Sequence, residues 1–277
     1  MARQAQEPKE YTELNSLMPV GFIGHGAPTL GLERHGPTVD AWREWGKSLP
    51  RPKAILVVSA HWLQKPHHLG PINAVSLTYD FMGFPDELYQ VEYPAPPAPL
   101  LSKEVMHLLT KVGIKPGTNS DRGLDHGAWV PLMHMFPKAD IPVLQISIGT
   151  NVPMGEHLNL GRLLTPLRSK GVFILASGNI THNLRVVNFA DRYGEPEAWA
   201  KAFDQWCEGV LDRFELDSLA DYQKVAPEAR MAHPTDDHFT PLLVAAAAAG
   251  KEGKPEIRYP HTGFEYGTLS MRCVEFS

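Results

Sequence analysis

Apolar runs of strand length recur along this chain, and three of them each lead to a histidine. They are Met18 to Ile23 before His25, Ala54 to Ser59 before His61, and Val172 to Ser177 before His182. Continuous apolar runs of this length are typical of parallel strands that are covered on both faces. Ligand sites collect outside the carboxyl ends of such strands, so the pattern predicts an α/β sheet with imidazoles at one edge.

Helical patterns alternate with the apolar runs, and this alternation indicates the fold class. One helix is predicted to open at Asp125 and another to cover Thr240 to Ala249, while further strands are predicted at Ala74 to Thr78 and Leu269 to Phe276. We expect a single α/β domain over residues 18–277, with a central mixed, largely parallel sheet flanked by helices. Residues 1–17 show neither pattern, and we expect them to form a flexible leader.

The composition excludes several classes of protein. Lys and Arg number 26 against 31 Asp and Glu, a net charge of −5 with no basic run, so we expect no nucleic acid partner. No apolar stretch reaches the ~18 residues of a membrane span, and no apolar signal region opens the chain. The two cysteines form no metal-type pair. We therefore expect a reduced, cytoplasmic protein, either a monomer or a small homo-oligomer.

Five of the 13 histidines lie in local sequences that favour a functional site. They are His25, His61, His126, His182 and His238. Imidazole is the commonest protein ligand for zinc and iron, and it also titrates near neutral pH. Each histidine also has a structural interpretation, as a turn cap, a helix cap or a buried ring bonded to backbone.

Local sequence separates these histidines from one another. His25 lies between two glycines, which clear space for a ligand. His182 follows a strand and a turn, so metal ligand and general base both stay open for it. His126 opens a helix, where the dipole disfavours the imidazolium, so a neutral ring there can donate to a bound oxygen species or accept a proton. His238 has the weakest signal, because Asp236 and Asp237 could simply cap a helix.

The same histidines belong to short motifs that are informative in combination. These are Gly24-His25-Gly26-Ala27-Pro28, Ser59-Ala60-His61-Trp62, Asp80-Phe81-Met82-Gly83-Phe84-Pro85, Leu124-Asp125-His126-Gly127, His182-Asn183-Leu184-Arg185 and His238-Phe239. With them the chain resembles the class III, LigB-type extradiol ring-cleavage dioxygenases, in the DODA-type branch that includes 4,5-DOPA extradiol dioxygenase. The resemblance extends over about residues 18–276, nearly the whole chain.

The resemblance implies an α/β fold with one mononuclear metal site. It makes His25, His61 and His238 the metal ligands. It makes His182 the acid or base beside the metal, sometimes described as a ligand, and His126 a histidine that faces substrate or O₂. The acidic residues next to His238 keep open whether a carboxylate takes part, because the wider class uses two histidines and a carboxylate.

Aromatic residues accompany these motifs, and we expect them to hold a flat substrate ring. They are Trp62, Phe81, Phe84, Tyr89 and Trp129. The chain departs from the usual family sequence at Ala27-Pro28 and at Pro96-Pro97. Both departures can reshape the pocket, so the identity of the substrate does not carry over with the resemblance.

The implied chemistry requires a metal with open coordination positions. Fe(II), one per chain, would support cleavage of a catechol by O₂ to a muconic semialdehyde. Zn(II) fits the same histidines and can occupy them in purified or crystallised protein, but it is redox-inactive. Two alternatives stay open at this point: a zinc-dependent hydrolase that uses a metal-bound hydroxide, and a non-enzymatic metal-binding homologue.

Overall fold

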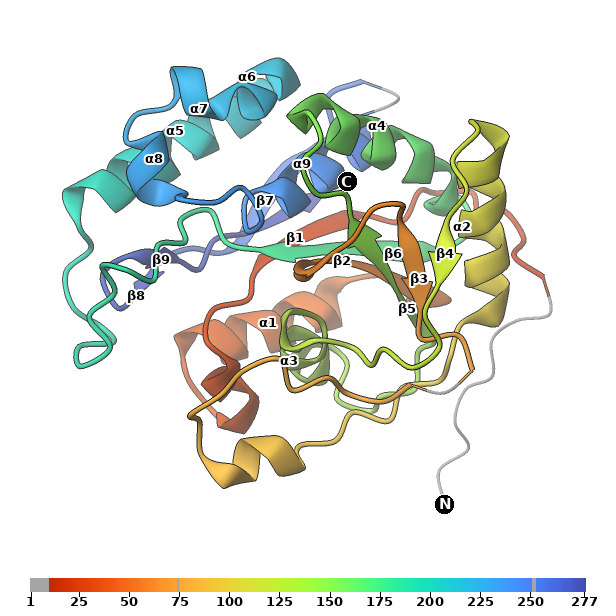
Figure 1. Ribbon diagram of the computed structural model, residues 1–277, viewed down its shortest axis with the longest axis horizontal. Coiled ribbons are helices and arrows are strands. Elements are labelled where there is room, and N and C mark those ends of the chain that lie inside the picture. The colour runs from red at the N-terminus through yellow and green to blue at the C-terminus, as the bar shows by residue number, and fades with distance from the viewer. Residues whose placement is uncertain (1–9, 74, 251–252) are drawn as a thin grey trace.

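The computed structural model describes residues 10–73, 75–250 and 253–277, and its centre is a mixed sheet (Figure 1). The strand order is β4-β3-β5-β2-β6-β1-β10-β7. The central strands run parallel, and they are β5 (Val143–Ile148), β2 (Ala54–Leu63), β6 (Val172–Gly178) and β1 (Val20–Gly24). The predicted fold class, an α/β domain with a mixed and largely parallel sheet, is confirmed.

Shorter strands extend the sheet at both edges. β10 (Cys273–Phe276) is antiparallel to β1, and β7 (Ile257–His261) is antiparallel to β10. On the other side β3 (His68–Gly70) is antiparallel to β5, and β4 (Gly117–Thr118) runs parallel to β3. A separate hairpin pairs β8 (Phe264–Glu265) with β9 (Leu269–Ser270).

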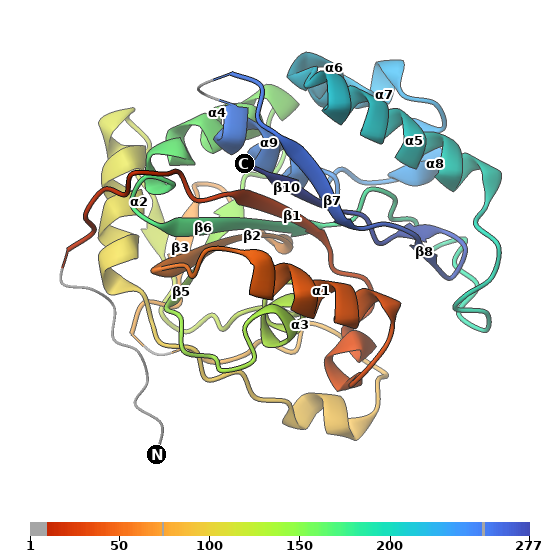
Figure 2. The same ribbon diagram turned by 180° about the vertical axis from the view of Figure 1, so that it is seen from behind.

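Helices cover both faces of the sheet, which explains why its central strands are largely apolar. Every residue of β1, β5 and β6 is buried. One face packs against α1 (Pro37–Ser48), α3 (His126–Met135) and the 3₁₀ turn η1 (Pro28–Leu32). The opposite face packs against α2 (Pro99–Lys111), α4 (Met154–Leu164) and α9 (Thr240–Ala249), as the view from behind shows (Figure 2).

Further helices lie on the side of α9 and α4. They are α5 (Ala198–Arg213), α6 (Leu216–Ala220), α7 (Tyr222–Val225) and α8 (Ala229–Ala232) (Figure 1). Two more 3₁₀ turns, η2 (Asp86–Gln90) and η3 (Thr165–Leu167), lie in connections. The long segment between β6 and α5 carries no helix or strand in the described part of the chain.

Small residues allow α9 to lie close to the sheet. The helix is buried on all sides and ends in five consecutive alanines, as expected for a helix with no solvent face. A Cβ on Gly178, at the end of β6, would lie 2.1 Å from the carbonyl oxygen of His238. The backbone N–H of Asn179 donates to that same carbonyl at 3.0 Å. The backbone at His238, just before α9, therefore packs directly against the end of β6.

Two predicted strands differ from the structure. The predicted strand Leu269 to Phe276 is divided into β9 and β10, because the chain changes its pairing partner from β8 to β1. At the break the guanidinium of Arg272 turns inward to Asp204, 2.6 Å away. The prediction of a strand from Ala74 to Thr78 is wrong over its described residues, which form only an isolated bridge at Leu77. Ala74 itself lies outside the described residues.

Part of the predicted leader contacts the domain. Residues 1–9 lie outside the described residues, whereas Leu14 donates its backbone N–H to the carbonyl of Ser169 at 2.6 Å. The domain boundary at residue 18 stays a prediction. Every helix within the described ranges is too short or too polar to span a bilayer. The expectations about cellular location, nucleic acid and oligomeric state also stay predictions.

Candidate metal centre

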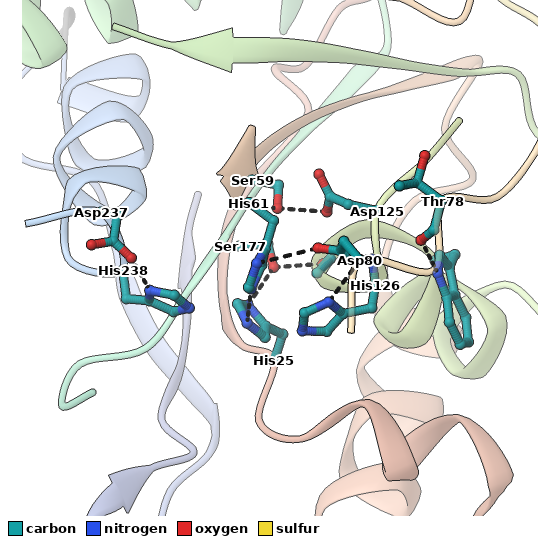
Figure 3. Close-up of polar contacts among 12 residues, drawn as sticks. His25, Ser59, His61, Thr78, Asp80, Asp125, His126, Ser177, Asp237 and His238 are labelled. Carbon is teal, nitrogen blue, oxygen red and sulfur yellow. Dashed lines mark hydrogen bonds and ion pairs between the residues drawn. The ribbon is translucent and has the colours of Figure 1, made fainter. Parts of the chain in front are cut away.

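Adjacent strand ends bring the five candidate histidines into one region. His25 follows β1 directly, His61 lies near the end of β2, and His182 comes shortly after β6. These strands are parallel neighbours, so their carboxyl ends share one edge of the sheet. His126 opens α3, and His238 comes just before α9. Figure 3 shows the rings of His25, His61, His126 and His238 gathered around a common space.

The distances among three of these rings fit one metal ion. The Nε2 atoms of His25 and His61 are 3.0 Å apart. One ring nitrogen from each of His25, His61 and His238 lies within 4.8 Å of the other two. Two nitrogens about 2.1 Å from the same ion, at roughly right angles, would be about 3 Å apart. The three predicted ligands are thus close enough together to bind a single ion.

Ser177 determines which nitrogen of His25 faces the cluster. Its Oγ donates to the carbonyl oxygen of Gly127 at 2.5 Å, which uses the only hydroxyl proton. The same Oγ lies 2.9 Å from Nδ1 of His25 and can only accept there. His25 therefore carries its proton on Nδ1, and its Nε2 presents a lone pair to the other rings. Metal-bound histidines usually have this arrangement.

His238 shows the same arrangement more strongly. Its Nδ1 contacts a carboxylate oxygen of Asp237, and its Nε2 is buried with no hydrogen-bond partner among the described residues. A buried polar nitrogen without a partner is costly, so an unpaired one requires an explanation. A cation bound at Nε2 supplies one, and the residues present fit a metal ion.

Burial keeps these imidazoles neutral. It lowers the pKa of His61 to about 4, and the neighbouring His126 adds to the effect. Burial followed by the charge of His61 lowers the pKa of His25 well below its usual value, and burial followed by His182 does the same for His238. Neutral rings keep the lone pairs that metal ligation requires.

Asp80 is a member of this site that the sequence reasoning missed. Its Oδ1 accepts hydrogen bonds from Nδ1 of His126 at 2.9 Å and from the backbone N–H of His126 at 3.0 Å. Its Oδ2 lies 3.3 Å from Nδ1 of His61. Burial raises the pKa of Asp80, but the hydrogen bonds and charge of His126, together with the charge of His61, outweigh burial and hold the pKa at about 2. The available signal was its place as the one acid of the Asp80–Pro85 motif.

A buried carboxylate ties the end of β2 to α3 beneath the histidines. Asp125, fully buried, accepts hydrogen bonds from Ser59 at 2.7 Å and from Gln145, and pairs with Arg122 at 3.1 Å. Arg122 also donates to the carbonyl oxygen of His61 at 2.9 Å. These contacts fix the backbone that carries His61 relative to the helix that carries His126.

Gly127 packs closely against these residues, and Gly127→Ala is expected to destabilise the fold. A Cβ there would lie 2.7 Å from Ser59 Oγ and 3.2 Å from both a His61 ring carbon and Ser177 Oγ. Overpacking of this kind costs about 1–3 kcal/mol. Denaturant unfolding measures the loss, and weaker zinc binding is expected to accompany it.

Gly155→Ala is the matched control, because Gly155 is also the second residue of its helix, but the methyl group added there would have no atom within 4 Å. That variant is expected to be stabilised by roughly 0.5–1 kcal/mol. Equal stability of the two variants would contradict the packing described around Gly127.

His182 lies beside the three-histidine cluster rather than within it. Its ring stacks on that of His238, with centroids 3.4 Å apart and planes 5° apart. Its side chain has no hydrogen bond in the described part of the chain, and burial lowers its pKa to about 4. A second group of possible ligands, made of His182, Asp237 and His238, keeps a direct role at the metal open.

Four of the five predicted aromatic residues form one cluster next to His126. The ring of Phe81 lies 5.8 Å from that of His126, and the rings of Phe84, Tyr89 and Trp129 lie 5.3, 5.2 and 6.4 Å from Phe81. Trp129 is fully buried, whereas the other three are partly exposed. This cluster, made of Phe81, Phe84, Tyr89 and Trp129, is called the aromatic cluster below.

Trp62 is not brought to the histidines. Its Nε1 donates to the side-chain oxygen of Gln64 at 3.2 Å, and the guanidinium of Arg122 lies 4.9 Å above its ring. No ring contact joins it to the histidines among the described residues. Its assignment to the substrate wall therefore stays a prediction without support from the geometry.

Comparison with known proteins defines the class to which this fold and site belong. The family model described as the catalytic LigB subunit of aromatic ring-opening dioxygenase matches residues 22–271. The chain belongs to this family and is an extradiol ring-opening dioxygenase of class III, in the DODA branch. The family resemblance stated from the sequence motifs is confirmed, and it favours ring opening over the zinc hydrolase and the non-enzymatic homologue.

Individual relatives match over nearly their whole length. The 4,5-DOPA dioxygenase extradiol of Beta vulgaris is 40% identical over 260 residues, which is 92% of this chain and 95% of that relative. The protein of the same name from Escherichia coli K12 is 35% identical over 275 residues, 96% and 97% of the two chains. A crystal structure of an uncharacterized protein from Escherichia coli K12 superposes with a TM-score of 0.79 at 33% identity, covering 94% of this chain and all of that one.

Proposed function

We propose that this enzyme uses Fe(II), one per chain, to cleave a catechol with O₂ and release a muconic semialdehyde. The observation that carries the proposal is the convergence of His25, His61 and His238, with Nε2 of His238 buried and unpaired among the described residues. The proposed product holds every atom of the catechol and both atoms of O₂, so no further reductant is needed.

The ligand set is proposed to be His25, His61 and His238, each bound through Nε2. Fe(II) bound by three neutral imidazoles would supply open coordination positions and the redox chemistry that dioxygen requires. Ser177 and Asp237 support this assignment, because they occupy the Nδ1 atoms of His25 and His238. The protein itself contributes the orientation of the rings and the dry surroundings of the site.

A catechol is the proposed substrate, and the aromatic cluster is proposed to hold its ring. Relatives with nearly complete coverage are named for 4,5-DOPA, so DOPA is the first substrate to test. Phe81 and Tyr89 lie next to the His126 ring and are partly exposed, so a flat ring could contact them on entering.

Proton transfer is assigned to two histidines on different sides of the cluster. His182 is proposed to accept a proton from a substrate hydroxyl, because its neutral ring has no competing hydrogen bond among the described residues. His126 is proposed to return a proton in a later step. Its Nδ1 is engaged by Asp80, so the proton that it donates must first be accepted at Nε2.

Anaerobic reconstitution with Fe(II), followed by aeration with DOPA, protocatechuate, caffeate and catechol, tests the proposal. One equivalent of O₂ consumed per substrate, with a yellow ring-cleaved product, is expected for at least one of them. Zinc-loaded protein is the control and is expected to be inactive. Iron-replete protein that consumes no O₂ with any of the four would contradict the proposal, and oxygen-independent activity of the zinc form would indicate a hydrolase.

A further inference from the structure

Asp80 connects parts of the site that come from different segments. It lies in the loop between β3 and η2, directly before Phe81 of the aromatic cluster. Its side chain, only 17% exposed, contacts the ring of His126 on α3 and the ring of His61 on β2. Among the ion pairs of the described residues, Asp80 alone pairs with both a proposed ligand and a proposed proton carrier.

One oxygen of Asp80 fixes the tautomer of His126. Oδ1 accepts from the backbone N–H of His126 at 3.0 Å, which places it at the start of α3. The same oxygen lies 2.9 Å from Nδ1 of the His126 ring. An ionised carboxylate can only accept, so Nδ1 carries the ring proton and Nε2 is left with a lone pair.

The second oxygen is in position to do the same for His61. Oδ2 is buried and has no aligned hydrogen bond in the described part of the chain, although it lies 3.3 Å from Nδ1 of His61. A buried carboxylate oxygen without a donor is unfavourable. A small rotation of the His61 ring would align its Nδ1–H with Oδ2, and that tautomer leaves Nε2 free to bind a metal.

We propose that Asp80 is a positioning residue that holds His61 and His126 in the same Nδ1–H tautomer and so presents both Nε2 atoms to the site. The inference rests on the proposed function, because His61 is taken as a metal ligand. Asp80 also directly precedes Phe81, so it links the position of the aromatic cluster to that of the ligand His61. Carboxylates that orient metal-bound histidines in this way typically contribute 10–100-fold to metal affinity.

Asp80→Asn tests this role, because an amide has one accepting and one donating end. Its oxygen can replace Oδ1 toward His126, but its NH₂ group then faces the Nδ1–H of His61. Zinc affinity, measured by chelator competition on the full chain, is expected to fall about 10–100-fold. Asp86→Asn removes an exposed carboxylate at the start of η2, directly after the same loop, and is expected to bind zinc like the wild type.

Nitrogen NMR of the histidine rings in zinc-bound protein supplies a readout that does not depend on activity. In the wild type His126 is expected to carry its proton on Nδ1, and the Nδ1–H of His61 is expected to exchange slowly with water. In Asp80→Asn the Nδ1–H of His61 is expected to exchange quickly with water. The Nδ1–H groups of His25 and His238 are expected to stay protected from exchange, because they are bonded to Ser177 and Asp237.

The outcomes separate the two proposals. Wild-type protein that binds no zinc would count against the metal centre itself. The role of Asp80 would be overturned if zinc-bound wild-type protein carried the His126 proton on Nε2, or if its His61 Nδ1–H exchanged freely with water. This measurement uses the wild type alone, so it holds even if the variant does not fold. An Asp80→Asn variant that binds zinc within twofold of the wild type would overturn it as well.

Discussion

His25→Ala is expected to remove metal binding at the centre and ring cleavage with it. His25 is 2% exposed, and its Nε2 lies 3.0 Å from that of His61. Altering a group that only orients a ligand costs about 10–100-fold in affinity, so the loss of a ligand is expected to exceed about 100-fold. Metal content after reconstitution, and O₂ uptake with the best substrate of the panel, measure the two effects.

The control for this prediction is His35→Ala. His35 is only ten positions further along the chain, but its side chain is 89% exposed and its only described partner is Asp40 at 3.6 Å. That variant is expected to keep full metal content and activity. Stoichiometric iron in His25→Ala, with activity near that of the wild type, would contradict the assignment of His25 as a ligand.

His182→Ala is expected to lower kcat by about 10²–10⁴-fold while leaving the metal content unchanged. This fall in kcat is the size expected when a general acid or base is lost. The retained metal follows from the geometry, because His182 stacks on the face of the His238 ring instead of completing the three-nitrogen cluster. Single-turnover rates on iron-replete protein, together with iron content, separate chemistry from metal binding.

The same variant decides between the two roles left open for His182. A fall in metal affinity comparable to that of His25→Ala would make His182 a fourth ligand, which leaves a coordination position blocked until substrate arrives. Unchanged kcat would remove it from the proton transfer altogether. His107→Ala, on the exposed side of α2, controls for loss of an imidazole and is expected to behave like the wild type.

The sheet could be predicted where burial imposes one composition on a whole strand. β6 is covered on both faces, so its sequence is an apolar run from Val172 to Ala176 with clear limits. β7 has no such signal, because Ile257–His261 lies at the edge of the sheet, is incompletely buried and contains a proline. β3 and β4 are too short for any periodicity to show.

The candidate site could be predicted as far as single residues carry a local signal. His25 has flanking glycines and a preceding strand, and His61 ends an apolar run, so both are visible in sequence. The partners of their Nδ1 atoms are not, because Ser177 is 152 positions from His25 and joins it only through the pairing of β1 with β6. Asp80 meets His126 across 46 positions for a similar reason.

The close contact between the end of β6 and the start of α9 has a consequence for the metal centre. His238 lies just before α9, and its carbonyl can dock on the end of β6 because Gly178 has no side chain there. Gly178 therefore sets how far the segment that carries His238 lies from the sheet. Any side chain at that position would push the His238 imidazole away from those of His25 and His61, so a residue with no side chain sets the spacing of the nitrogens.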